Sequence, residues 1–143
     1  MKKCFVFIAV VCVTLAASAN DEKFLQALQS CSSFSDSGSV NTEGLDVVTQ
    51  KNILGMESDR CVYQEKVRFS GINSCVTCRF TDSQINEIVS VMRAYNLVQR
   101  YSGESVDTSS LDSVKDNPVV RVWNKYLQDS SICTITAEQT NAQ

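Results

Sequence analysis

Cys75 and Cys78 are separated by two residues, a spacing at which two cysteines can react as a pair. Such a pair can exchange thiols for disulfides, usually where a helix start lowers the pKa of the first thiol. Here the pair falls in residues 74–80, which have the composition of a strand, and the two side chains then point to opposite faces. We expect Cys78 to face the interior and Cys75 to be a free outward thiol. Redox catalysis by the pair is the alternative interpretation.

A carboxylate, Glu65, occupies an unusual position in the preceding strand-like segment, residues 61–69. Alternation places Glu65 on the same face as Cys61, Tyr63 and Val67, which we expect to be the buried face. A carboxylate in apolar surroundings has a perturbed pKa and could serve as an acid or base in hydrolysis. The competing interpretation is a structural carboxylate that pairs with an arginine.

Three cations, Lys66, Arg68 and Arg79, alternate onto the opposite face of the same two segments. Together they form a candidate patch for an anionic ligand or an acidic partner. Exposed strands routinely carry lysine and arginine, so an ordinary solvated sheet face is the alternative.

The sequence contains no histidine, which excludes Ser-His-Asp and Cys-His nucleophile systems within this chain and the usual histidine metal sites. It also lacks a glycine-rich phosphate loop. We therefore expect no cofactor and no metal.

The N-terminus has the pattern of a cleavable secretory signal peptide, residues 1–19. Lys2 and Lys3 precede an apolar run over residues 5–17, and Ala17-Ser18-Ala19 supplies a cleavage site before Asn20. The run is shorter than the roughly 20 residues that span a bilayer. We expect a secreted or periplasmic protein that has no membrane contact after cleavage.

Without Lys2 and Lys3, 11 of the 13 basic residues remain against 16 acidic ones, a net charge of −5. This negative charge opposes nucleic-acid binding, because phosphates require a cationic surface. The expected partner is therefore a protein or a small ligand.

Cysteine number and compartment together predict disulfides, because exported proteins mature in an oxidising environment. Cys4 and Cys12 leave with the signal peptide, so five cysteines remain and at least one is unpaired or pairs with another chain. With Cys75 as the odd thiol, the other four form two bridges. We favour Cys61–Cys78 across a hairpin and Cys31–Cys133 between the ends of the domain, although four cysteines allow three pairings.

The remaining elements must position these residues within a single domain, residues 20–136. Hydrophobic periodicity predicts three helices, beginning near residues 21, 83 and 118. Strands are expected over 45–56, 61–69 and 74–80 as an antiparallel meander, with a short closing strand over 131–136. Residues 32–44 are expected to be a loop, and residues 137–143 a disordered tail. The order predicts an α+β fold: a three- to four-stranded antiparallel sheet packed by about three helices and stabilised by disulfides.

These features favour a non-catalytic exported domain that binds a partner or has an envelope-associated role. A histidine-free secreted hydrolase or thiol-redox protein is one alternative, and a secreted inhibitor or effector is another.

Overall fold

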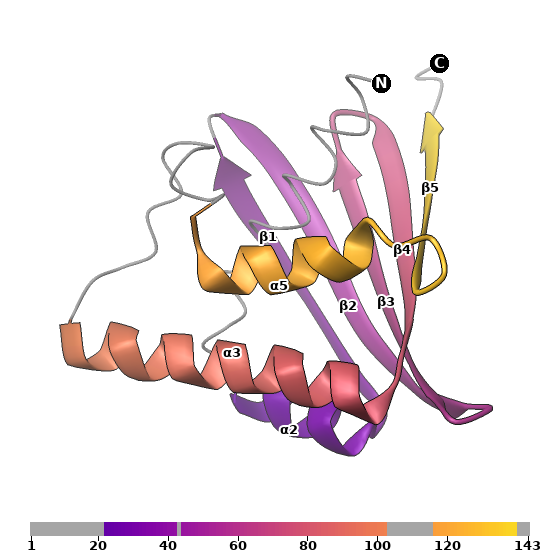
Figure 1. Ribbon diagram of the computed structural model, residues 1–143. Coiled ribbons are helices and arrows are strands. Elements are labelled where there is room, and N and C mark those ends of the chain that lie inside the picture. The colour runs from indigo at the N-terminus through magenta and orange to yellow at the C-terminus, as the bar shows by residue number, and fades with distance from the viewer. Residues whose placement is uncertain (1–21, 43, 103–115, 140–143) are drawn as a thin grey trace.

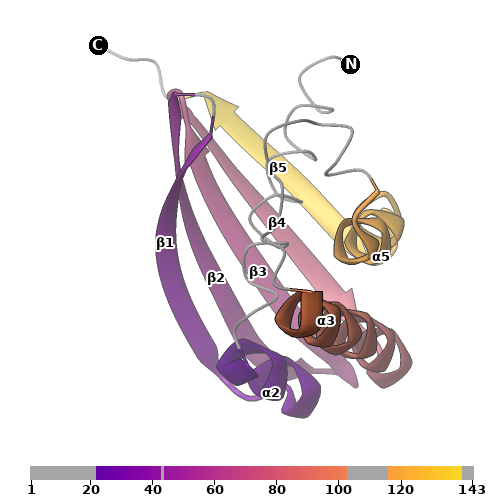
Figure 2. The same ribbon diagram turned by 90° about the vertical axis from the view of Figure 1, so that its left-hand side faces the viewer.

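The computed structural model describes residues 22–42, 44–102 and 116–139, and these form an α+β fold with one antiparallel sheet. Five strands lie in sequence order, β1-β2-β3-β4-β5. Helices α2, α3 and α5 lie on one face of the sheet and leave the other face uncovered by helices (Figures 1 and 2). The elements are α2 (Glu22–Ser30), β1 (Phe34–Thr42), β2 (Leu45–Glu57), β3 (Arg60–Phe69), β4 (Ile72–Phe80), α3 (Asp82–Ser102), α5 (Pro118–Leu127) and β5 (Cys133–Gln139).

The two central hairpins have tight two-residue turns. Ser58 and Asp59 join β2 to β3, and both have positive φ, 48° and 68°. Ser70 and Gly71 join β3 to β4, again with positive φ, 45° and 74°. Positive φ at both central residues matches the right-handed twist of the flanking strands and favours a hairpin. These turns set the register at each hairpin end, and the pairing of β2 with β3 shifts once more at an irregularity between Ile53 and Gly55.

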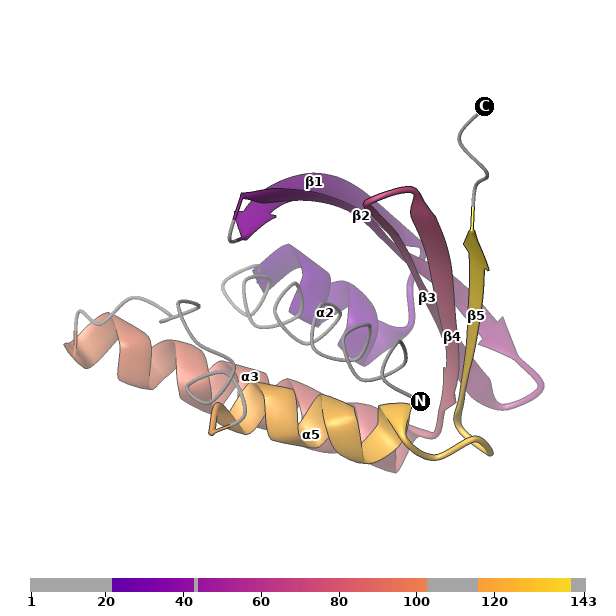
Figure 3. The same cartoon turned by 90° about the horizontal axis from the view of Figure 1, so that it is seen from above.

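The sheet is larger than the sequence patterns predict, and two expectations are wrong. The segment expected to be a loop, residues 32–44, contains strand β1, which pairs with β2 from Phe34 to Thr42. The closing strand continues to Gln139, three residues into the expected disordered tail. The fold therefore has five strands rather than three or four. In the view from above, β1 and β2 curve around α2 (Figure 3).

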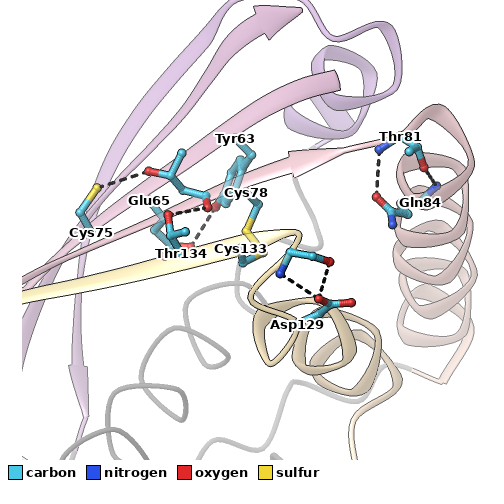
Figure 4. Close-up of a disulfide and its surroundings, with 11 residues drawn as sticks. Tyr63, Glu65, Cys75, Cys78, Thr81, Gln84, Asp129, Cys133 and Thr134 are labelled. Carbon is cyan, nitrogen blue, oxygen red and sulfur yellow. Dashed lines mark hydrogen bonds between the residues drawn. A yellow bond between two sulfur atoms is a disulfide. The ribbon is translucent and has the colours of Figure 1, made fainter. Parts of the chain in front are cut away.

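Helices α3 and α5 begin at residues that the sequence identifies as helix starts. The backbone N–H of Thr81 donates to Gln84 Oε1 at 2.9 Å, and the Gln84 N–H donates back to Thr81 Oγ1 at 3.3 Å (Figure 4). This capping box satisfies two N–H groups that have no partner within the helix. At α5, Asn117 Oδ1 accepts from the Val119 N–H at 2.9 Å, and Pro118 occupies the first turn.

The core lies between the sheet and the three helices and is centred on aromatic rings. Trp123 of α5 is completely buried and packs against Tyr63 of β3 and Phe80 of β4, with ring centroids 5.3 and 5.7 Å apart. Phe24 of α2 contacts Tyr63 from the other side at 6.1 Å. Tyr63 therefore contacts both α2 and α5, which lie on the same face of the sheet.

Two disulfides link elements within this core, where Cys61, Cys78 and Cys133 are buried. Cys31, directly after α2, pairs with Cys61 of β3. Cys78 of β4 pairs with Cys133 of β5, and Figure 4 shows this second bridge. The same four cysteines were expected to be bridged, but the favoured connectivity, Cys61–Cys78 with Cys31–Cys133, is wrong. The register explains why: Cys61 lies opposite Phe80, while Cys78 lies opposite both Tyr63 and Cys133.

The predicted signal peptide lies outside the described residues. None of the helices that are described is long and apolar enough to cross a membrane.

Candidate functional site: a groove on the outer face of the sheet

The groove forms on the sheet face that the helices do not cover. Side chains alternate between the two faces of each strand, and the strand register places equivalent positions side by side. One outward row joins Gln50, Lys66, Cys75 and Thr136 across β2, β3, β4 and β5. The adjacent outward row, listed in strand order, joins Val48, Arg68, Asn73 and Glu138.

These two rows line a cavity of about 510 Å³ that is open to solvent. Residues of all five strands contribute to its lining, including Lys66, Arg68, Asn73, Cys75 and Glu138. Small-molecule sites commonly occupy roughly 300–1,000 Å³, so the groove is large enough for a ligand of several residues or rings.

The positive and negative side chains in the groove lie on different strands. Lys66 and Arg68 lie two residues apart on β3 and are both exposed. Glu138 lies on β5, in the same row as Arg68, with Asn73 between them. No ion pair joins any of these three charges to another described residue. The groove therefore presents positive charge over β3 and negative charge over the edge strand β5.

Cys75 lies between these two sides and keeps its thiol. It is free and partly buried, with Sγ 3.9 Å from Thr77 Oγ1. The hydroxyl of Thr136 donates to the Cys75 carbonyl oxygen at 3.4 Å and ties β4 to β5 at this point. The register puts Cys75 directly opposite Lys66. A reagent that enters the groove therefore meets a thiol with a cation beside it.

The third cation of the sequence-derived patch, Arg79, does not join the groove. It lies four residues along β4 from Cys75, opposite Val62, and forms an ion pair with Glu57 at 3.8 Å. Both side chains are about half exposed or more, so the pair is a solvated contact at the other end of the sheet. The structure brings together only two of the three predicted cations.

Glu65 points to the opposite face and is completely buried. Its Oε2 accepts a hydrogen bond from the Tyr63 hydroxyl at 2.9 Å, and Lys51, itself 7% exposed, lies opposite it on β2. Burial is the main reason that the pKa of Tyr63 is well above its usual value, and the charge of Glu65 and its hydrogen bond add to the rise. Glu65 does not line the groove, and it belongs with the packing of the interior.

The charged groove residue that the sequence patterns missed is Glu138. It falls in the segment 137–143 that was expected to be disordered, so it was not considered as part of a sheet face. The alternation of polar and apolar residues through CTITAEQ, residues 133–139, is the signal that could have found it.

Within the described ranges, no group of three or more cysteine or carboxylate side chains could hold a metal ion. Comparison of the chain with protein-family models, with curated proteins and with solved structures found no match.

Proposed function

We propose that the protein is an exported, disulfide-stabilised binding domain that holds a ligand in the groove on the outer face of its sheet without catalysing a reaction. The observation that carries this proposal is the 510 Å³ groove with Lys66 and Arg68 in it. Two exposed cations with no ion-pair partner among the described residues attract an anionic group of the ligand.

Export is supported by the signal-like N-terminus and is compatible with the two disulfides. The bridges also suit a binding role, since they tie α2 to β3 and β4 to β5. A groove formed by five paired strands has little freedom to rearrange, so less ordering entropy is lost when a ligand binds.

The free thiol of Cys75 provides a test that requires no knowledge of the ligand. Two disulfide reagents are compared, the dianionic 5,5′-dithiobis(2-nitrobenzoate) and the neutral 4,4′-dithiodipyridine. At about 7 Å in water, two unit charges interact by ~0.6 kcal/mol, which is close to a threefold change in rate. Replacing Lys66 and Arg68 together by glutamine should slow the anionic reagent roughly three- to sevenfold more than the neutral one, whose rate reports any change in the thiolate itself.

The Arg79→Gln variant is the matched control, because it removes one cation from the same sheet face but outside the groove. It should change neither rate, and added salt should diminish the advantage of the anionic reagent in the wild type. Equal slowing of both reagents by the Lys66/Arg68 double variant, or no slowing of either, would contradict an anion-attracting groove.

A further inference from the structure

We infer that the ligand of the groove is a short peptide with free termini, about three residues long, whose carboxylate lies over β3 and whose amino group lies over β5. The inference rests on the proposed binding function and adds the class and length of the ligand. It follows from the positions of the three charges, which are opposite in sign on the two sides of the groove.

The separation of the charges sets the length of the ligand. Glu138 on β5 and Arg68 on β3 lie in the same row, and strand β4 lies between them. Neighbouring strands lie about 4.8 Å apart, so the backbone positions of Glu138 and Arg68 are ~10 Å apart. An extended chain spans at most about 3.3–3.6 Å per residue, so three residues cover this distance in full, whereas two reach it only if both side chains lean towards the ligand.

The sign of the charges sets the direction of the ligand and disfavours a polyanion. Lys66 and Arg68 offer donors to a carboxylate, and arginine can bind both of its oxygens. Glu138 offers an acceptor to an ammonium group but repels a second anion. A long polyanion would be drawn to β3 and opposed at β5, whereas a dipolar ligand is favoured at both ends. Between them, Asn73 can both donate to and accept from the amides of a peptide.

The experiment uses the folded, oxidised, exported chain and four peptides: trialanine, N-acetyl-trialanine, trialanine amide and dialanine. Binding is measured by calorimetry and by protection of the Cys75 thiol from iodoacetamide, read from the intact mass. Trialanine should slow alkylation in a saturable way. Blocking either terminus should weaken binding about tenfold, because each charge-assisted hydrogen bond contributes roughly 1.5 kcal/mol, and dialanine should bind more weakly than trialanine.

Substitutions separate the two ends. Glu138→Gln should make trialanine and its acetylated form bind alike, while the preference for a free carboxylate remains. In the Lys66/Arg68 glutamine double variant, trialanine and trialanine amide should bind alike, while the preference for a free amino group remains. Glu57→Gln, a carboxylate on the same sheet but outside the groove, is the control and should leave all four affinities unchanged.

Equal binding of free and blocked peptides, or binding of none, would overturn the inference. In either case the proposed function is judged separately: if the anionic reagent still reacts selectively at Cys75 through Lys66 and Arg68, the groove attracts anions but does not select dipolar peptides. Loss of that selectivity as well would refute both.

Discussion

Removing one disulfide at a time gives a quantitative test of the connectivity. Replacing Cys31 and Cys61 together by alanine should remove one bridge and leave Cys78–Cys133 intact. In the chain-entropy model a bridge across a sequence separation of 30 stabilises by about 3.6 kcal/mol. Domains of this size have a stability of roughly 5–15 kcal/mol, so the variant should remain folded with a lower urea midpoint.

The mismatched pair, Cys61→Ala with Cys78→Ala, is the control that makes the test decisive. It breaks both bridges, and the second closes a separation of 55, about 4.2 kcal/mol, so the combined loss is about 8 kcal/mol. This loss is large enough to unfold the domain or nearly so. Among the cysteines of the described residues, alkylation without reduction should find one free thiol in the first variant, Cys75, and three in the second, Cys31, Cys75 and Cys133.

The connectivity expected from the sequence predicts the reverse. Under Cys61–Cys78 with Cys31–Cys133, the mismatched pair would keep one bridge and the matched pair would lose both. A Cys61/Cys78 variant that is more stable than the Cys31/Cys61 variant, with fewer free thiols, would refute the register argument.

Two further predictions concern single side chains of the interior and of a helix start. Folded Tyr63 keeps its proton well above pH 10, whereas the unfolded chain releases it near pH 10, so its stabilising contribution is complete below pH 10 and is lost as the pH rises further. The difference in unfolding free energy between the wild type and Tyr63→Phe should therefore shrink from pH 8 to pH 11 in urea titrations, and a constant or growing difference would contradict the assignment. Thr81→Ala removes the acceptor of the Gln84 N–H and should cost about 1 kcal/mol, whereas Ser83→Ala, exposed in the same turn, should cost a few tenths at most.

The elements predicted best are those with strong local periodicity. Helix α3 was expected to begin near residue 83 and is observed from Asp82 to Ser102. Its apolar residues recur every three to four positions, and its capping residues satisfy the first N–H groups, so sequence neighbours alone specify it. The central strands of the meander were predicted for the same reason, because their buried and exposed residues alternate with a period of two.

Strand β1 could not be predicted in this way, because its composition, FSDSGSVNT, is that of a loop. It lies at the edge of the sheet, and its described side chains after Phe34 are exposed. No apolar face therefore marks it in the sequence. Its regular structure comes from backbone hydrogen bonds to β2, the next strand of the chain, rather than from an apolar face of its own.

The sequence by itself determined which face each side chain would take: Cys75, Lys66 and Arg68 point outward, and Cys61, Glu65 and Cys78 point inward, because the covalent geometry of a strand imposes alternation. Only the tertiary structure decided which of these residues meet. Register and strand order place Cys78 opposite Cys133 and bring Glu138 into the groove with Arg68. Both choices depend on pairing between distant segments, which no local pattern specifies.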